Sequence, residues 1–274
     1  MKNHYEFRPI NTTSTPFAVS NISEQASGET RLLKNNQVLI KIKAISAEKR
    51  QQNRQNGGGL PGRFVEWIHS SSFTMRRFGF SGIIQAVGSS NGEYPINDEV
   101  FGTALLKGGS TAYVILSENG DDAESGLFYS KPDLLTFEEA AIAAADGLTA
   151  LGLLNTAKVH RGQSILVVTA ENCLSTWIIQ LALCFGAGIS AIHLPGSDQR
   201  VKYPEKVQVM ENPPMGNDQY DVIIDTGGMD ISHYKSGLKP GGKYLTINDA
   251  AEPYLVDLVF LQKVIVANLL QISR

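Results

Sequence analysis

The sequence has few cysteines and no excess of positive charge, and each shortage excludes a class of protein. Its 274 residues include only 2 cysteines, Cys173 and Cys184, which lie in one predicted helix. About three helical turns separate them, so an intact helix cannot bring them into a disulfide, and no cysteine-rich metal site is expected. The net charge is -3 and no stripe of Lys and Arg alternates with aromatics. We therefore expect no nucleic-acid partner.

Long apolar runs are also lacking. The first residues, MKNHYEFRPINTTSTPF, contain no apolar core of a signal peptide, and no apolar run elsewhere approaches membrane-spanning length. From this we expect no membrane partner and a cytoplasmic location. A small-molecule substrate is the expected partner. The histidines are scattered along the chain without ligand spacing. They are His4, His69, His160, His193 and His233.

Alternating apolar and polar residues predict strands in the first half of the chain. QVLIKIKA (37–44) has the period of a strand with one buried face. SGIIQAVGSS (81–90) and STAYVIL (110–116) predict two more strands, with NDEVFG between them. Glycine and polar turns at these spacings predict an antiparallel β unit or a small barrel.

The pattern changes after Lys131. KPDLLTFEEAAIAAADGLTALGLLNTA (131–157) predicts a helix that Thr136 caps and whose first turn carries Glu138 and Glu139. Strands and a helix then alternate, which predicts a parallel sheet with crossover helices. The segments are strand QSILVVTA (163–170), helix STWIIQLALCFGA (175–187), and strands ISAIHLP (189–195), YDVIIDTGG (220–228) and LKPGGKYLTIN (238–248).

The order of these segments resembles the zinc-free medium-chain dehydrogenase/reductases of the quinone oxidoreductase and enoyl reductase branch. FGFSGIIQAVGSSNGEYPINDEVFG (78–102) is similar to the family's Gly-rich strand pair, and 131–154 resembles its interdomain helix. The resemblance implies an α/β fold: a GroES-like antiparallel β barrel, 1–130, as catalytic and substrate domain, and a shortened Rossmann-like nucleotide-binding domain with a parallel sheet, 131–274. It also implies that substrate and nicotinamide bind in the cleft between them.

The resemblance places the family's glycine-rich cofactor turn on 169–176, where this chain has no glycine. Glycines there let backbone N–H groups approach the pyrophosphate, while the helix N-terminus supplies partial positive charge. Asn tolerates left-handed backbone, and Ser175 or Thr176 could offer a hydroxyl to a phosphate. A packed turn that binds no phosphate is the other interpretation, and both stay open. The candidate contacts in this turn are Asn172, Cys173, Leu174, Ser175 and Thr176.

Three further segments carry candidate cofactor contacts by the same resemblance. These contacts are Thr149, Ser197, Arg200, Lys202, Asp225, Thr226 and Gly227. Thr149 matches a family position near the nicotinamide, although a Thr in an Ala-rich helix also packs or bonds its own backbone. Arg200 and Lys202 favour NADPH over NADH because basic residues there pair with the 2′-phosphate. A short basic cluster is also typical of a solvated surface.

Zinc is not expected, because the alcohol dehydrogenases of the superfamily hold it with a Cys and a His in the first domain. Both cysteines of this chain lie in the second half, and no proton donor can be assigned. The resemblance implies zinc-independent, NADPH-dependent transfer of hydride to a small conjugated carbonyl compound of the quinone or enone type. The alternative is a catalytically silent descendant that acts as an interaction or regulatory subunit.

The end of the sequence differs from the family. KVIVANLL (263–270) predicts an apolar strand near the family's dimer contact, and the sequence stops where relatives continue towards the first domain. An unpaired apolar strand would be prone to aggregation, so we expect a homodimer. The shorter C-terminus would leave the cofactor groove more open.

Overall fold

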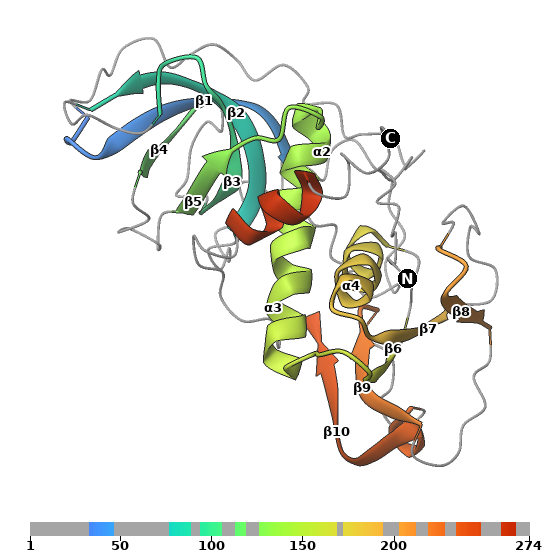
Figure 1. Ribbon diagram of the computed structural model, residues 1–274. Helices are drawn as coiled ribbons and strands as arrows, with labels where there is room; N and C mark the ends of the chain where they lie inside the picture. The colour runs from blue at the N-terminus through green and yellow to red at the C-terminus, as the bar shows by residue number, and fades with distance from the viewer. Residues whose placement is uncertain are drawn as a thin grey trace, which may run out of the picture.

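Two sheets form the framework of the protein in this computed structural model (Figure 1). The first is an antiparallel, curled sheet and the second is parallel, consistent with a GroES-like domain and a Rossmann-like domain, so the predicted fold class is confirmed. The domain boundary at 130/131 stays a prediction. The structure describes residues 33–46, 77–88, 94–105, 113–118, 126–168, 172–193, 203–211, 219–227, 234–247 and 259–266.

The antiparallel sheet has the order β4-β1-β2-β3-β5. Its strands are β1 (Gln37–Ser46), β2 (Arg77–Val87), β3 (Glu99–Leu105), β4 (Tyr113–Ser117) and β5 (Gly126–Ser130). In β1 the alternate residues Val38, Ile40 and Ile42 are buried, as the period of two predicted. They pack with aromatic residues of the neighbouring strands, including Phe80 and Phe128. This sheet therefore has a core of its own.

The parallel sheet has the order β10-β9-β6-β7-β8. Its strands are β6 (Ser164–Val168), β7 (Gly188–Ile192), β8 (Val207–Met210), β9 (Tyr220–Asp225) and β10 (Leu238–Thr246). From β6 the chain runs outward through β7 to β8, and it then returns to the other side of β6 as β9. The strand order thus reverses between β6 and β9, which is the point where open parallel sheets bind ligands.

One long helical stretch lies between the two sheets (Figure 1). It consists of α2 (Phe137–Ile142), a π-helical turn (Ala143–Gly147) and α3 (Leu148–Ala157). The predicted cap at Thr136 is confirmed: its hydroxyl accepts from Glu139 N at 3.2 Å, and the Glu139 carboxylate accepts from Thr136 N at 2.9 Å. The helix therefore begins where the sequence predicted.

This stretch also corrects an expectation. By length and composition alone, Phe137–Ala157, 21 residues, is long and apolar enough to cross a membrane, although we expected no run of that kind. In the fold, 67% of the apolar 18-residue stretch within this helix is buried. A buried core helix passes the same test of length and composition, so the test is weak evidence for a membrane.

Close contacts hold the antiparallel sheet against this helical stretch. Gly79 in β2 lies against Ala141 and Ala145, and the Ser81 hydroxyl donates to Phe137 O. The buried Lys131 amine donates to Leu135 O at 2.7 Å and forms an ion pair with the Glu99 carboxylate at 2.9 Å. The start of the helix is thereby fixed to strand β3 as well as to β2.

Residues 259–266 are helical, so the predicted strand at 263–270 is wrong for its described part, 263–266. Leu261 and Ile265, one helical turn apart, are fully buried in the core. Leu261 lies next to Gly147, and Figure 1 shows this short red helix against the long one. Burial of one helix face outweighs the strand preference of the β-branched residues. The homodimer prediction therefore loses the support of an unpaired apolar strand at 263–270.

Candidate functional site

The turn that begins α4 (Cys173–Cys184) is closed by side chains where the family uses glycines. Asn172 is the N-cap residue, and its Oδ1 accepts from Ser175 N at 2.7 Å. In return, Asn172 N donates to the Ser175 hydroxyl oxygen at 3.2 Å. This reciprocal capping box satisfies two donors that the end of the helix would otherwise leave without acceptors.

The hydroxyl groups expected to reach a phosphate have partners inside the turn. Ser175 Oγ donates to Asn172 O at 2.8 Å, and Thr176 Oγ1 donates to the same oxygen at 3.1 Å. Ser175 is 0% exposed and Thr176 is buried. Their hydrogens are therefore not directed towards a ligand, and a role in cofactor binding stays a prediction for both.

A side-chain bridge joins this turn to the end of β9. Asn172 Nδ2 donates to Thr226 Oγ1 at 3.0 Å, and Thr226 Oγ1 donates in turn to Val168 O at 3.1 Å. Val168 and Asp225 are paired residues at the ends of β6 and β9. The structure thus brings Asn172 and Thr226, two residues predicted on separate segments, together at the point where the strand order reverses.

Asp225 holds the turn after β9 in place. It is 1% exposed, and its Oδ1 accepts from Gly227 N at 2.8 Å while its Oδ2 accepts from the Tyr244 hydroxyl at 2.9 Å. Burial and the nearby Asp225 charge both raise the pKa of Tyr234. The sequence analysis missed both tyrosines, because neither belongs to a motif.

The beginning of α4 still has features that suit an anion. The capping box engages Ser175 N, and Thr176 N donates to Asn172 O at 3.2 Å. The N–H groups of Cys173 and Leu174 lie outside that box at the positive end of the helix dipole, and that of Cys173 makes a hydrogen bond to its own thiol. This arrangement can hold one phosphate group through backbone donors with Asn172 Nδ2 beside them.

One negative charge opposes such a ligand. Burial, and secondarily the charge of Asp146 in the π-helical turn, raise the pKa of the Cys173 thiol from 9.0 to about 11. The thiol is therefore protonated near neutral pH and is a poor nucleophile. The same Asp146 charge lowers the affinity of the α4 N-terminus for an anion.

The remaining predicted contacts are placed differently. Thr149 is half-buried and its hydroxyl donates to Ala145 O at 2.9 Å, a bond within its own helix. A contact with the nicotinamide stays a prediction for this residue. Ser197, Arg200 and Lys202 lie outside the described residues. Within the described ranges, no group of three or more His, Cys, Asp or Glu side chains could hold a metal ion.

Comparison with known proteins gives the context for this geometry. No family model matches the chain. Quinone oxidoreductase from Homo sapiens is 22% identical over 231 residues, which cover 78% of this chain and 65% of that protein. 2-Methylene-furan-3-one reductase from Solanum lycopersicum is 28% identical over 234 residues, covering 81% of this chain and 57% of that protein. The chain thus spans less than two thirds of the length of these curated relatives.

Solved structures share the fold. The quinone oxidoreductase from Coxiella burnetii is 20% identical with a TM-score of 0.60, over 87% of this chain and 81% of that one. CurK enoyl reductase is 20% identical with a TM-score of 0.55, over 89% and 81%. The Helicobacter pylori CAD complexed with NADP(H) is 17% identical with a TM-score of 0.56, over 84% and 74%. The relatives and neighbours are thus quinone oxidoreductases, enoyl reductases and other enzymes of the medium-chain superfamily, as the resemblance predicted.

Proposed function

We propose that the chain is a zinc-independent, NADPH-dependent oxidoreductase that transfers hydride to a small conjugated carbonyl compound, a quinone or an enone. The relatives are oxidoreductases of the quinone oxidoreductase and enoyl reductase type, which supports the general reaction. The observation that carries the proposal is the Asn172–Thr226 bond at the point of strand reversal, beside the N-terminus of α4. A dinucleotide needs an anion site at this place.

The residues present fit such a cofactor. The N–H groups of Cys173 and Leu174 would hold the pyrophosphate, with Asn172 Nδ2 exchanging its Thr226 partner for a phosphate oxygen. These backbone N–H groups and the Asn172 side-chain amide would take the place of the N–H donors that a glycine-rich turn provides. When bound, the nicotinamide supplies the hydride. The residues of this chain bind and orient it, and positioning carries much of the rate enhancement.

The preference for NADPH rests on Arg200 and Lys202, whose positive charges would pair with the 2′-phosphate, and on Ser197, whose hydroxyl would donate to it. In a fluorescence titration we expect saturable binding of NADPH. The substitution Arg200→Glu should lower the affinity for NADPH more than the affinity for NADH. Lys263→Glu, the same charge reversal on the exposed face of the C-terminal helix, is the matched control and should change neither affinity. Equal weakening of both cofactors would show that the basic cluster does not read the 2′-phosphate.

The same titration tests the alternative. If neither NADPH nor NADH binds at millimolar concentration, the chain is the catalytically silent descendant and the search moves to protein partners. If NADPH binds, its oxidation with a panel of quinones and enones identifies the substrate. Turnover that survives extensive chelation supports zinc independence.

The proposed unit is a homodimer in the cytoplasm, with neither nucleic acid nor membrane among its partners. Apart from the resemblance, no described contact supports a dimer, so light scattering on the purified chain decides the matter. A mass of twice 29.8 kDa is expected. A monomer at micromolar concentration would contradict it.

A further inference from the structure

The turn after β9 is held by a side chain from the neighbouring strand, β10. In the parallel register Thr246 pairs with Asp225, and Tyr244 pairs with Ile223. Because side chains alternate along a strand, Tyr244 and Asp225 lie on the same face of the sheet, one diagonal step apart. The Tyr244 hydroxyl spans this step and donates to Asp225 Oδ2 at 2.9 Å. The Tyr244 ring packs against the apolar cluster that contains Ile223, so the ring is anchored independently of its hydroxyl.

A series of hydrogen bonds connects Tyr244 with the N-terminus of α4. The second oxygen of the Asp225 carboxylate, Oδ1, accepts from Gly227 N at 2.8 Å. A bond of this kind, two residues along the chain, fixes the backbone around the residue between them, Thr226. Thr226 Oγ1 in turn accepts from Asn172 Nδ2 at 3.0 Å. Tyr244 is therefore the far end of a network whose near end is the Asn172 side-chain amide.

The direction of that amide matters because the turn at 169–176 contains no glycine. Asn172 Nδ2 is the side-chain donor of the proposed phosphate site. A donor that must be ordered when the ligand binds costs affinity, whereas a donor that its neighbours already hold in place does not. Thr226 gives Nδ2 its direction before a ligand arrives, and the turn that carries Thr226 depends on Asp225.

We propose that Tyr244 is a positioning residue for the cofactor phosphate, an inference that rests on the function proposed above. The Tyr244 hydroxyl holds the Asp225 carboxylate, and the carboxylate holds the turn at Thr226. This turn keeps Asn172 Nδ2 beside the N–H groups that begin α4. Tyr244 thus acts through Asp225, without contact to the cofactor.

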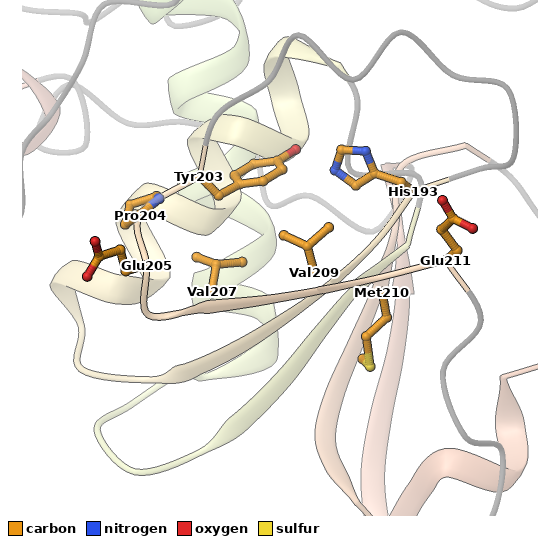
Figure 2. A pocket seen from close by; sticks show the side chains of 8 residues that line it. All are labelled: His193, Tyr203, Pro204, Glu205, Val207, Val209, Met210 and Glu211. Atoms are coloured by element: carbon orange, nitrogen blue, oxygen red, sulfur yellow. The ribbon is translucent and has the colours of Figure 1, made fainter.

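The cavity beside this part of the sheet supports an indirect role. It has a volume of about 400 Å³ and lies over β8 and next to the end of β7 (Figure 2). Its lining includes His193 and Tyr203, and the predicted contacts Ser197, Arg200 and Lys202 fall between these two residues in the sequence. The cavity therefore belongs to the crevice that we propose for the cofactor. Tyr244 is not among the described residues that line it.

The direct test is fluorescence titration of the whole chain carrying Tyr244→Phe with NADPH. Phenylalanine keeps the ring in the apolar cluster and removes only the hydroxyl. The dissociation constant should rise roughly threefold to tenfold, up to the value of one hydrogen bond to a charged group. Tyr220→Phe is the matched control, because Tyr220 belongs to the same apolar cluster and lies at the other end of β9. The control should bind NADPH as tightly as the unaltered protein.

Two further readouts separate positioning from a general loss of stability. In turnover with a quinone, Tyr244→Phe should raise the KM for NADPH and leave kcat at saturating NADPH unchanged. A smaller folded fraction would instead lower kcat at an unchanged KM. When Tyr244→Phe is combined with Asn172→Ala, the two losses of affinity should be less than additive, because the first acts through Asn172. Fully additive losses, or a fall in kcat alone, contradict the proposal.

Hydrogen exchange in the cofactor-free protein tests the same network without NADPH. The Gly227 N–H bonds to Asp225 Oδ1, so its exchange should be faster in Tyr244→Phe and unchanged in Tyr220→Phe. If the unaltered chain binds no NADPH, the proposed function fails and this inference fails with it. If NADPH binds, but Tyr244→Phe changes neither its affinity nor the exchange at Gly227, this inference alone is overturned.

Discussion

Gly79→Ala is expected to lower the free energy of unfolding by about 3 kcal/mol, at the upper end of the usual cost of overpacking. A Cβ at this position in β2 would lie 2.7 Å from Ala145 N and 2.8 Å from Ala145 Cβ, and it would also overlap Ala141 O. Two of these three atoms are backbone, which no change of rotamer can move away. Strand and helix must separate, so the contact between the two domains loosens. Denaturant unfolding followed by circular dichroism measures the effect.

The matched control is Gly188→Ala at the exposed start of β7. Its added Cβ would meet only Gln163 O, at 3.8 Å, which is an ordinary van der Waals distance. We expect a change within about 0.5 kcal/mol, as for most surface substitutions. If Gly79→Ala is as mild as this control, the close approach of β2 to the long helix does not exist in solution.

Parts of the fold were predictable because one physical effect dominated locally. The alternation in 37–44 predicted β1, since only one face of that strand is buried. Thr136 and the acidic first turn predicted the start of the long helix, because N-capping is a local interaction that needs no tertiary contact. The order of strands and helices in the second half predicted a parallel sheet in the same way.

Other elements gave no such signal. Strand β5 begins with three consecutive buried residues, Gly126, Leu127 and Phe128, so it has no period of two. Strand β3 likewise buries the adjacent Val100 and Phe101. The C-terminal helix was mistaken for a strand because its β-branched residues favour strands, whereas tertiary packing of Leu261 and Ile265 decides its conformation.

In the candidate site, too, some contacts could be predicted from the sequence and others could not. The resemblance assigned Asn172 and Thr226 to one site, and the structure places them in contact. The internal hydrogen bonds of Ser175 and Thr176 were not predictable, because each hydroxyl can choose between a ligand and a nearby carbonyl. The Tyr244–Asp225 bond joins two strands, so only the sheet register reveals it.

Asn172→Asp should weaken NADPH binding by at least tenfold while stability changes little. Asp is as good an N-cap residue as Asn, since its carboxylate also accepts from Ser175 N, and its charge interacts favourably with the helix dipole. The substitution removes the Nδ2 donor and places a negative charge beside the pyrophosphate. At about 4 Å and an effective dielectric constant of about 20, that repulsion amounts to about 4 kcal/mol before screening by salt. Fluorescence titration and denaturant unfolding of the same preparation measure the two quantities.

Asn172→Ala separates the loss of a donor from the gain of a charge. It removes the cap, which costs about 1 kcal/mol of stability, and it adds no charge, so its NADPH affinity should fall between those of the unaltered protein and Asn172→Asp. The deficit of Asn172→Asp should shrink as salt concentration rises, whereas that of Asn172→Ala should not, because only the first is electrostatic. If Asn172→Asp binds NADPH as tightly as the unaltered protein at low salt, the pyrophosphate does not lie at the N-terminus of α4. A glycine-free turn would then be a packed turn only, and any cofactor would have to bind elsewhere in the fold.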